Sequence, residues 1–156
     1  MFYYILLFVI LLIYASLYYI FNNEVSIYQT NIQNFNFELL FKKQPIIIDD
    51  NIDIKKIIND WFSYNLIYEN ITFSDNWNKN NYKYLLIYSN DDVEILLCNP
   101  KCSTTNNFPN ENSEPSLIKL NNKLLIVPFN WYYHTNNTNI IIYGIHDYIT
   151  YFLSKI

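Results

Sequence analysis

Two histidines, His134 and His146, are the only side chains of this 156-residue chain whose ordinary pKa lies near neutral pH. His134 follows two tyrosines and could bind a metal ion, but a stable metal site takes three or more ligands. His146 precedes Asp147, which suits either an acid–base pair or the first turn of a helix, where an aspartate complements the helix dipole. We predict no catalytic residue and take His134 as the one candidate metal ligand.

Two kinds of covalent modification have candidate positions. Cys98 and Cys102 are separated by three residues, and no second ligand pair accompanies them as a zinc site would require. A disulfide between them needs Cα atoms about 6 Å apart and an oxidising compartment, whereas both stay free thiols in a reducing one. Asn70 and Asn136 begin Asn-x-Thr sequons, which are glycosylated only if the domain faces a secretory lumen.

The composition excludes several classes of function. Gly144 is the only glycine, so neither a glycine-rich phosphate loop nor a nucleophile elbow can form. The ten basic residues are all lysines and the net charge is −4, which disfavours nucleic-acid binding. The 25 asparagines and 25 isoleucines indicate AT-rich coding, as in a large DNA virus or a protist.

The first 21 residues contain no charged side chain. Twenty helical residues at about 1.5 Å each cover the roughly 30 Å hydrocarbon core of a bilayer. Tyrosines at both ends suit the headgroup regions, and no small-x-small cleavage site follows. We therefore predict an uncleaved transmembrane signal anchor over residues 1–21, with the lipid bilayer as a partner, a polar stalk over 22–34 and a single-pass membrane location. The sequence does not determine the orientation.

For residues 35–156 we predict one β-rich, mostly antiparallel domain without internal repeats. Together with the predicted helices, this places the chain in the α+β class. Asp53 begins a helical pattern in which apolar residues recur every three or four positions to Phe62. Alternating or β-branched runs predict strands, and the turn residues between neighbouring runs predict hairpins. The predicted strands are 35–39, 44–50, 83–88, 93–98, 117–120, 123–127, 131–135 and 140–143, followed by a helix or strand over 146–155.

Several segments of this domain resemble cupin-like proteins of the Jumonji-C type. The segment Val127–His134 runs from a strand through a proline and an aromatic cluster to a histidine. Asp92–Pro100 is similar to the strand of that family that ends in a proline, and Lys119–Ile126 is similar to the turn and strand before its histidine. Gln44–Ile48 resembles the opening strand, and Trp61 lies in a helix where the family often has tryptophan.

The resemblance implies a double-stranded β-helix of two packed sheets. Active members bind Fe(II) through a His-x-Asp or His-x-Glu pair and a later histidine, with 2-oxoglutarate alongside. His134 matches the later histidine, but the earlier pair is missing. His146 and Asp147 are adjacent, so on a strand their side chains would point to opposite sides. A cupin-like shell without the iron site is therefore the more economical interpretation, and no cofactor is expected.

We accordingly expect a single-pass, membrane-anchored protein that is not an enzyme and acts by binding or assembly. Trp131, Tyr132 and Tyr133 are the candidate interface residues, because tryptophan and tyrosine dominate binding hot spots. A protein partner is expected, nucleic acid is not, and a viral source would suggest a membrane or virion component. The alternative is an oxygenase dependent on Fe(II) and 2-oxoglutarate with a non-standard metal site.

Overall fold

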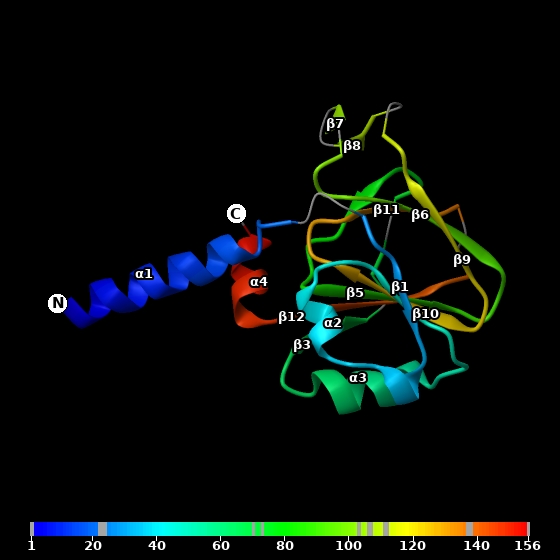
Figure 1. Ribbon diagram of the computed structural model, residues 1–156, viewed down its shortest axis with the longest axis horizontal. Coiled ribbons are helices and arrows are strands. Elements are labelled where there is room, and N and C mark those ends of the chain that lie inside the picture. Colours follow the sequence, from blue (N-terminus) through cyan, green and yellow to red (C-terminus); the bar gives the residue numbers. More distant parts are fainter. Residues whose placement is uncertain are drawn as a thin grey trace.

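The computed structural model describes residues 2–21, 25–69, 71–72, 74–102, 104–105, 108–110, 113–136 and 139–155. Two β-sheets face each other, small helices lie against the outside, and one long helix, α1 (Phe2–Leu17), extends away from the sheets (Figure 1).

The larger sheet has the strand order β1-β2-β10-β5-β12-β3, and the smaller sheet has the order β4-β11-β6-β9. Strands β7 (Thr104–Thr105) and β8 (Phe108–Pro109) form a separate ribbon in the connection from β6 to β9. The strands of the larger sheet are β1 (Tyr28–Thr30), β2 (Ile46–Ile48), β3 (Leu66–Glu69), β5 (Tyr84–Ser89), β10 (Lys123–Pro128) and β12 (Ile141–His146), and those of the smaller sheet are β4 (Asn78–Lys79), β6 (Val93–Cys98), β9 (Ser116–Leu120) and β11 (Tyr132–His134).

Eight of these strands pair in a nested antiparallel pattern. Strand β3 pairs with β12, β4 with β11, β5 with β10, and β6 with β9, so the first of the eight pairs with the last and the fourth with the fifth. Eight strands connected in this way, four in each of two facing sheets, form a jelly roll, the double-stranded β-helix that cupins share. The strand order therefore confirms the predicted β-rich, cupin-like domain.

The predicted hairpins are wrong, although the strands themselves are present. Strands β5 and β6 lie in different sheets, and so do β9 and β10, and β11 and β12. Each turn carries the chain from one sheet to the other. The apolar faces of the two strands then pack against each other across the core between the sheets. At the β9–β10 turn, Asn122 adopts a positive φ of 52°, a conformation that asparagine tolerates.

Two apolar cores hold the layers together. The first lies between the two sheets and includes the fully buried side chains of Leu85, Ile95 and Leu125. The second lies on the other face of the larger sheet, which α3 (Ile54–Phe62) covers with Ile57, Ile58 and Phe62. Asp53 is the N-cap of α3 and accepts hydrogen bonds from the backbone N–H groups of Lys55 and Lys56, which confirms the predicted helix.

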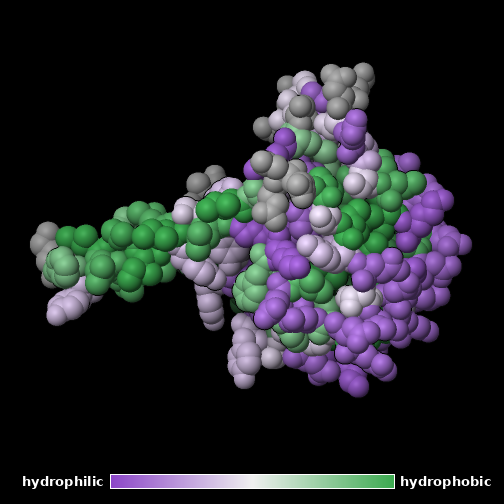
Figure 2. All heavy atoms as spheres, viewed as in Figure 1, coloured by the Kyte–Doolittle hydropathy of each residue, from purple (hydrophilic) through white to green (hydrophobic). Residues whose placement is uncertain are grey.

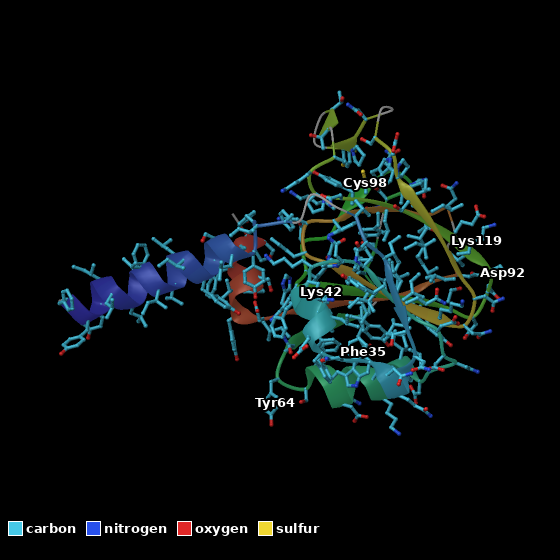
Figure 3. All side chains as sticks on the ribbon, viewed as in Figure 1. Phe35, Lys42, Tyr64, Asp92, Cys98 and Lys119 are labelled. Atoms are coloured by element: carbon cyan, nitrogen blue, oxygen red, sulfur yellow. The ribbon has the colours of Figure 1, made fainter. Side chains whose placement is uncertain are left out.

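Residues 35–39 do not form the predicted strand. The chain there enters the short helix α2 (Glu38–Phe41). Phe35, labelled in Figure 3, stacks on the indole ring of Trp61 in α3 with centroids 4.3 Å apart. Phe37 also contacts Trp61, edge to face, at 5.4 Å. The alternation of Phe35 and Phe37 therefore reflects two rings that pack on one indole.

The predicted transmembrane helix over residues 1–21 is wrong. Helix α1 has 16 residues, and no helix in the described part of the chain is long and apolar enough to cross a membrane. The helix ends at Leu17 because the N–H groups of Tyr18 and Tyr19 turn back to the carbonyls three residues earlier and because Lys43 binds the carbonyls of Leu17 and Ile20.

Part of the predicted stalk over residues 22–34 packs on the domain. Strand β1 pairs in parallel with β2, and the short 3₁₀ helix η1 (Ile32–Asn34) follows it, with Asn31 as its N-cap. The C-terminal segment forms α4 (Tyr148–Leu153), with Asp147 as its N-cap, as one of the two alternatives for residues 146–155 predicted.

Candidate functional site

A cavity of about 330 Å³ opens between the two sheets at the end of the jelly roll near α4. Tyr68 of β3, Tyr133 of β11 and His146 of β12 line it from the sheets. Tyr82, in the connection from β4 to β5, and Lys155, which follows α4, also line it. The mouth of a β-barrel is a common place for a ligand, so this cavity is the candidate site.

His146 is the last residue of β12, a strand of the larger sheet. Tyr143 and Ile145 contribute to the core beneath α3, whereas Ile142 contributes to the core between the sheets. Because side chains alternate along a strand, Gly144 and His146 share the inner face with Ile142. His146 is only 4% exposed.

Gly144 makes room for one wall of the cavity. A Cβ atom at this position would lie 2.4 Å from two carbon atoms of the Tyr82 ring, which is closer than van der Waals contact allows. The ring of Tyr82 therefore lies directly over Gly144 and beside the His146 imidazole, with ring centroids 4.6 Å apart. Only a residue without a side chain permits this arrangement.

The hydrogen bonds around Thr150 define the tautomer of His146. Thr150 Oγ1 lies 2.9 Å from Asp147 Oδ1 and 3.2 Å from His146 Nδ1, and it accepts the backbone N–H of Asp147. The hydroxyl has one proton, and the carboxylate is its strongest acceptor. From this network we assign the proton of His146 to Nδ1, which donates to Thr150, so Nε2 keeps its lone pair.

At neutral pH the cavity contains protonated phenols and a neutral imidazole. Burial lowers the pKa of His146 below its ordinary value of 6.5, and the charge of Lys155 lowers it further, against an opposing effect of Asp147. Burial also raises the pKa of Tyr82, with a contribution from Tyr68, and burial and Tyr82 raise the pKa of Tyr133 to about 12. The lining thus offers hydroxyl donors and one imidazole acceptor.

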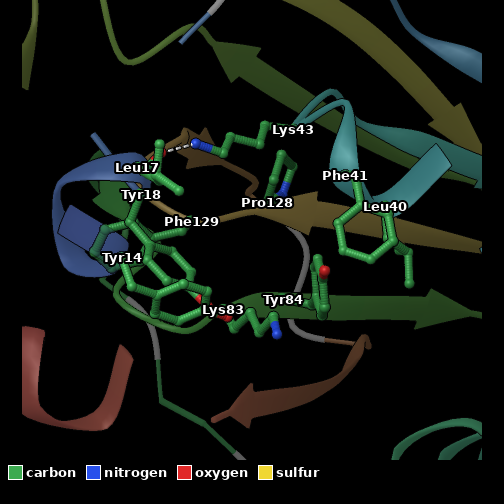
Figure 4. Close-up of a pocket in the computed structure, with 10 residues that line it drawn as sticks. All are labelled: Tyr14, Leu17, Tyr18, Leu40, Phe41, Lys43, Lys83, Tyr84, Pro128 and Phe129. Carbon is green, nitrogen blue, oxygen red and sulfur yellow. Dashed lines mark hydrogen bonds between the residues drawn. The ribbon is translucent and has the colours of Figure 1, made fainter. Parts of the chain in front are cut away.

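A second cavity, of about 230 Å³, lies where α1 meets the domain (Figure 4). Its wall is mainly apolar, with Leu17 from α1, Leu40 and Phe41 from α2, Pro128 at the end of β10 and Phe129 directly after it. The aromatic rings of Tyr18 and Tyr19 both contact Phe129 edge to face, at 5.9 and 5.8 Å.

Polar contacts hold the base of α1 against the domain. The ammonium group of Lys43 donates to the carbonyl of Leu17 (Figure 4) and, at 2.9 Å, to the carbonyl of Ile20. A cation at this end complements the helix dipole. The hydroxyl of Tyr18 donates to Asp147, whose Oδ2 also lies 2.8 Å from Lys83 Nζ. Burial acts to raise the pKa of Asp147, but hydrogen bonds from Lys83, Thr150 and Tyr18 outweigh it and lower the pKa to about 2.

The candidate metal ligand His134 lies outside the barrel cavity. Tyr133 points into the core between the sheets, so the next residue, His134, lies on the outer face of the smaller sheet with Glu94 and Leu96. The ring of His134 contacts that of Trp77 at 5.8 Å, and its buried Nδ1 has no hydrogen-bond partner. Over the described ranges, no group of three or more His, Cys, Asp or Glu could hold a metal ion, so metal binding by His134 stays a prediction.

The three candidate interface residues are all buried. Trp131, Tyr132 and Tyr133 are 1%, 6% and 4% exposed, and Trp131 Nε1 donates to the carbonyl of Lys43 at 3.1 Å. In this structure they pack the domain, and their predicted interface role remains a prediction.

The modification candidates are placed as follows. Cys98 and Cys102 are both free thiols, and burial together with the neighbouring Cys102 raises the pKa of Cys98 to about 12. Their disulfide stays a prediction. Asn136 is exposed, whereas Asn70 lies outside the described residues.

Sequence reasoning missed most of the cavity. It singled out His146 and Asp147 as a pair and Tyr133 as an interface residue, but it did not join these to Tyr68, Tyr82 or Lys155. A tyrosine over the only glycine is a contact between residues far apart in the sequence, and no local pattern reveals it. Asp147 and Thr150 do have capping-box spacing, with threonine in the place usually taken by Glu or Gln.

Comparison with known proteins gives little further information. No protein-family model matches the chain, and no curated protein matches it. Among solved structures, the chain is similar to RmlC from Streptococcus suis in complex with dTDP-D-xylose, with 12% identity and a TM-score of 0.30. The match covers 67% of this chain and 62% of that one. A likeness this low supports no argument about ligand or activity, and no finding bears on the Jumonji-C resemblance, which stays a prediction. The cupin-like fold rests on the strand pairing itself.

Proposed function

We propose that the protein acts by binding, without catalysis of its own, and that α1 holds its jelly-roll domain at a lipid bilayer. The observation that carries this proposal is the surface of α1. Every side chain from Phe2 to Ile13 is between 43% and 82% exposed, and none of them is charged. Figure 2 shows the helix as a mainly hydrophobic projection from a domain whose visible face has both hydrophilic and hydrophobic areas.

The distribution of apolar side chains favours lipid over a protein groove. A helix that docks in a groove has one apolar stripe and one polar face. Helix α1 is apolar on all sides, so an apolar environment must surround it to remove these side chains from water. Lipid hydrocarbon does this without a dedicated partner, which supports the choice of a bilayer as the binding surface.

The contacts at the base of α1 support a fixed attachment rather than a loose tether. Lys43 caps the helix end, and Tyr18 joins the helix to Asp147 and Lys83 of the domain. A domain held in this way keeps one orientation relative to the surface that α1 enters. Binding or assembly would then take place at the surfaces of the jelly roll.

Vesicle flotation tests the proposal. The full chain is mixed with phosphatidylcholine vesicles and centrifuged through a density gradient, and we expect it to float with the lipid. The double variant Leu7→Glu/Leu11→Glu adds two charges to α1, and we expect at least a tenfold loss of the floating fraction, because each charge in hydrocarbon costs about 2 kcal/mol or more.

A matched control adds a charge elsewhere. Leu117 on β9 is 51% exposed, so Leu117→Glu adds a carboxylate to an exposed leucine of the domain and should leave flotation unchanged. Circular dichroism verifies that all variants keep their β structure. A wild-type chain that stays at the bottom of the gradient, or a double variant that floats equally well, contradicts the proposal.

A further inference from the structure

We infer that the cavity at the open end of the jelly roll binds a small organic anion that carries a hydroxyl group. This inference does not depend on lipid binding by α1, because α1 does not line the cavity. The ligand class follows from the donors, acceptors and charges of the described lining residues.

Two tyrosine hydroxyls of the cavity lining, those of Tyr82 and Tyr133, have no hydrogen-bond partner among the described residues. Tyr133 is 4% exposed and Tyr82 is partly buried, and neither hydroxyl has a hydrogen bond to any described residue. Both hydroxyls are therefore free to donate a hydrogen bond to a ligand that enters the cavity. Because both pKa values are raised, both hydroxyls stay protonated at neutral pH and can donate.

The charge of the lining favours an anion. Lys155 brings an ammonium group close enough to His146 to lower the pKa of the imidazole. Among the described residues that line the cavity there is no Asp or Glu. A carboxylate or phosphate group of a ligand can therefore accept hydrogen bonds from Tyr82, Tyr133 and Lys155, and bonds assisted by the lysine charge are the strong ones. The nearby carboxylate of Asp147 does not line the cavity and is paired with Lys83.

His146 selects for a hydroxyl on the same ligand. Its Nδ1 donates to Thr150, so its Nε2 lone pair is an acceptor, and the imidazole is neutral at pH 7. A simple anion such as succinate offers no proton for this acceptor, whereas a hydroxyl group does. A site built around a ligand hydroxyl discriminates strongly against an analogue that lacks it, because its own polar group is then left unpaired.

The size of the cavity limits the ligand. A volume of about 330 Å³ is at the lower end of the range for small-molecule sites. The ring of Tyr82 forms one flat wall. Hydroxy acids and phosphate esters of short polyols share the required chemistry and fit this volume.

Calorimetric titration of the full chain in neutral detergent tests the inference with matched probes. L-malate and succinate differ by one hydroxyl, and glycerol 3-phosphate and inorganic phosphate compare a hydroxylated ester with the bare anion. We expect the hydroxylated probe of at least one pair to bind about tenfold more tightly than its counterpart. The pair that shows the difference identifies the anionic group as carboxylate or phosphate.

Conservative variants locate the binding. Tyr133→Phe removes one hydroxyl from the cavity, and Lys155→Gln removes its ammonium group, so we expect each to weaken binding of the better probe about tenfold. Tyr132→Phe removes a hydroxyl from the neighbouring residue, which does not line this cavity, and Lys56→Gln removes an exposed lysine of α3. Both controls should bind as the wild type does.

Four outcomes overturn the inference. The first is the absence of binding by any probe up to about 10 mM, a concentration well above that of a weak specific site. The second is equal binding within both pairs, which removes the role of the hydroxyl. The third is unchanged binding by Tyr133→Phe. Tighter binding of 2-oxoglutarate than of L-malate also counts against it and instead favours the oxygenase alternative.

Discussion

Asp147 connects the base of α1, the jelly roll and the cavity, so its removal is the most informative single change. Its carboxylate accepts from Tyr18, pairs with Lys83 at 2.8 Å and caps α4. Asp147→Asn abolishes the charge, but asparagine is as good an N-cap as aspartate. The variant therefore tests the charge and leaves the cap of α4 in place.

The pKa of Asp147 gives the expected magnitude. The fall from the ordinary 3.8 to about 2 corresponds to about 2.4 kcal/mol at 1.36 kcal/mol per pKa unit. The side chain is 20% exposed, so solvent screening reduces this figure only modestly. We expect Asp147→Asn to lower the free energy of unfolding by about 2 kcal/mol at pH 7.

The pH dependence follows from the direction of the change. The folded-state pKa lies below that of the unfolded chain, so the charged carboxylate stabilises the fold above about pH 3.8 and this contribution disappears as the pH falls through about 2. Urea unfolding of the full chain, followed by tryptophan fluorescence at pH 7, 5, 3 and 2, measures the difference between wild type and variant. We expect that difference to stay near its full value at pH 5 and to approach zero at pH 2.

A double-mutant cycle with Lys83 identifies the partner. Lys83→Met should destabilise the wild type but have little further effect in the Asp147→Asn background, because the ion pair is already lost. The reasoning is refuted if Asp147→Asn changes stability by less than about 0.5 kcal/mol at pH 7. It is also refuted if the difference persists undiminished at pH 2.

Two further predictions concern the glycine beneath the cavity and the core between the sheets. Gly144→Ala should displace the Tyr82 ring, because the new Cβ would lie 2.4 Å from it. We expect the free energy of unfolding, measured with urea, to fall by about 1–3 kcal/mol. An unchanged unfolding midpoint would contradict the close contact. Leu125→Ala, at a fully buried position, should cost about 2–5 kcal/mol. Leu117→Ala, at a leucine that is 51% exposed, should change the free energy of unfolding by less than about 0.5 kcal/mol. Equal effects of Leu125→Ala and Leu117→Ala would refute the assignment of the inner face.

Local patterns were sufficient for the elements that depend on neighbouring residues. The N-cap of Asp53 and the spacing of apolar residues predicted α3, and Pro45 with the isoleucines after it predicted β2. Residues 35–39 show the limit of this reasoning. Their alternation matched a strand, but both phenylalanines pack on Trp61, a residue far away in the sequence.

The N-terminal segment shows a second limit. Its composition alone predicted a helix, and α1 is indeed a helix, but the length of that helix depends on what its end contacts. Lys43 and the turn at Tyr18 and Tyr19 end it after 16 residues. Lys43 lies outside the apolar run from which the transmembrane prediction was made, so that run alone could not reveal its contact with the helix end.

The sequence by itself located the strands β2, β5, β6, β9, β10, β11 and β12, because runs of apolar and β-branched residues are a property of neighbouring residues, but it did not find β1, β3 or β4. It also excluded phosphate loops and nucleophile elbows through the single glycine. Only the tertiary structure decided that consecutive strands cross between sheets, since the pairing partner of a strand depends on the burial of both its faces. The cavity follows from the same cause: Tyr82, Tyr133 and His146 are distant in the sequence, and only the nested pairing of the jelly roll brings them to one opening.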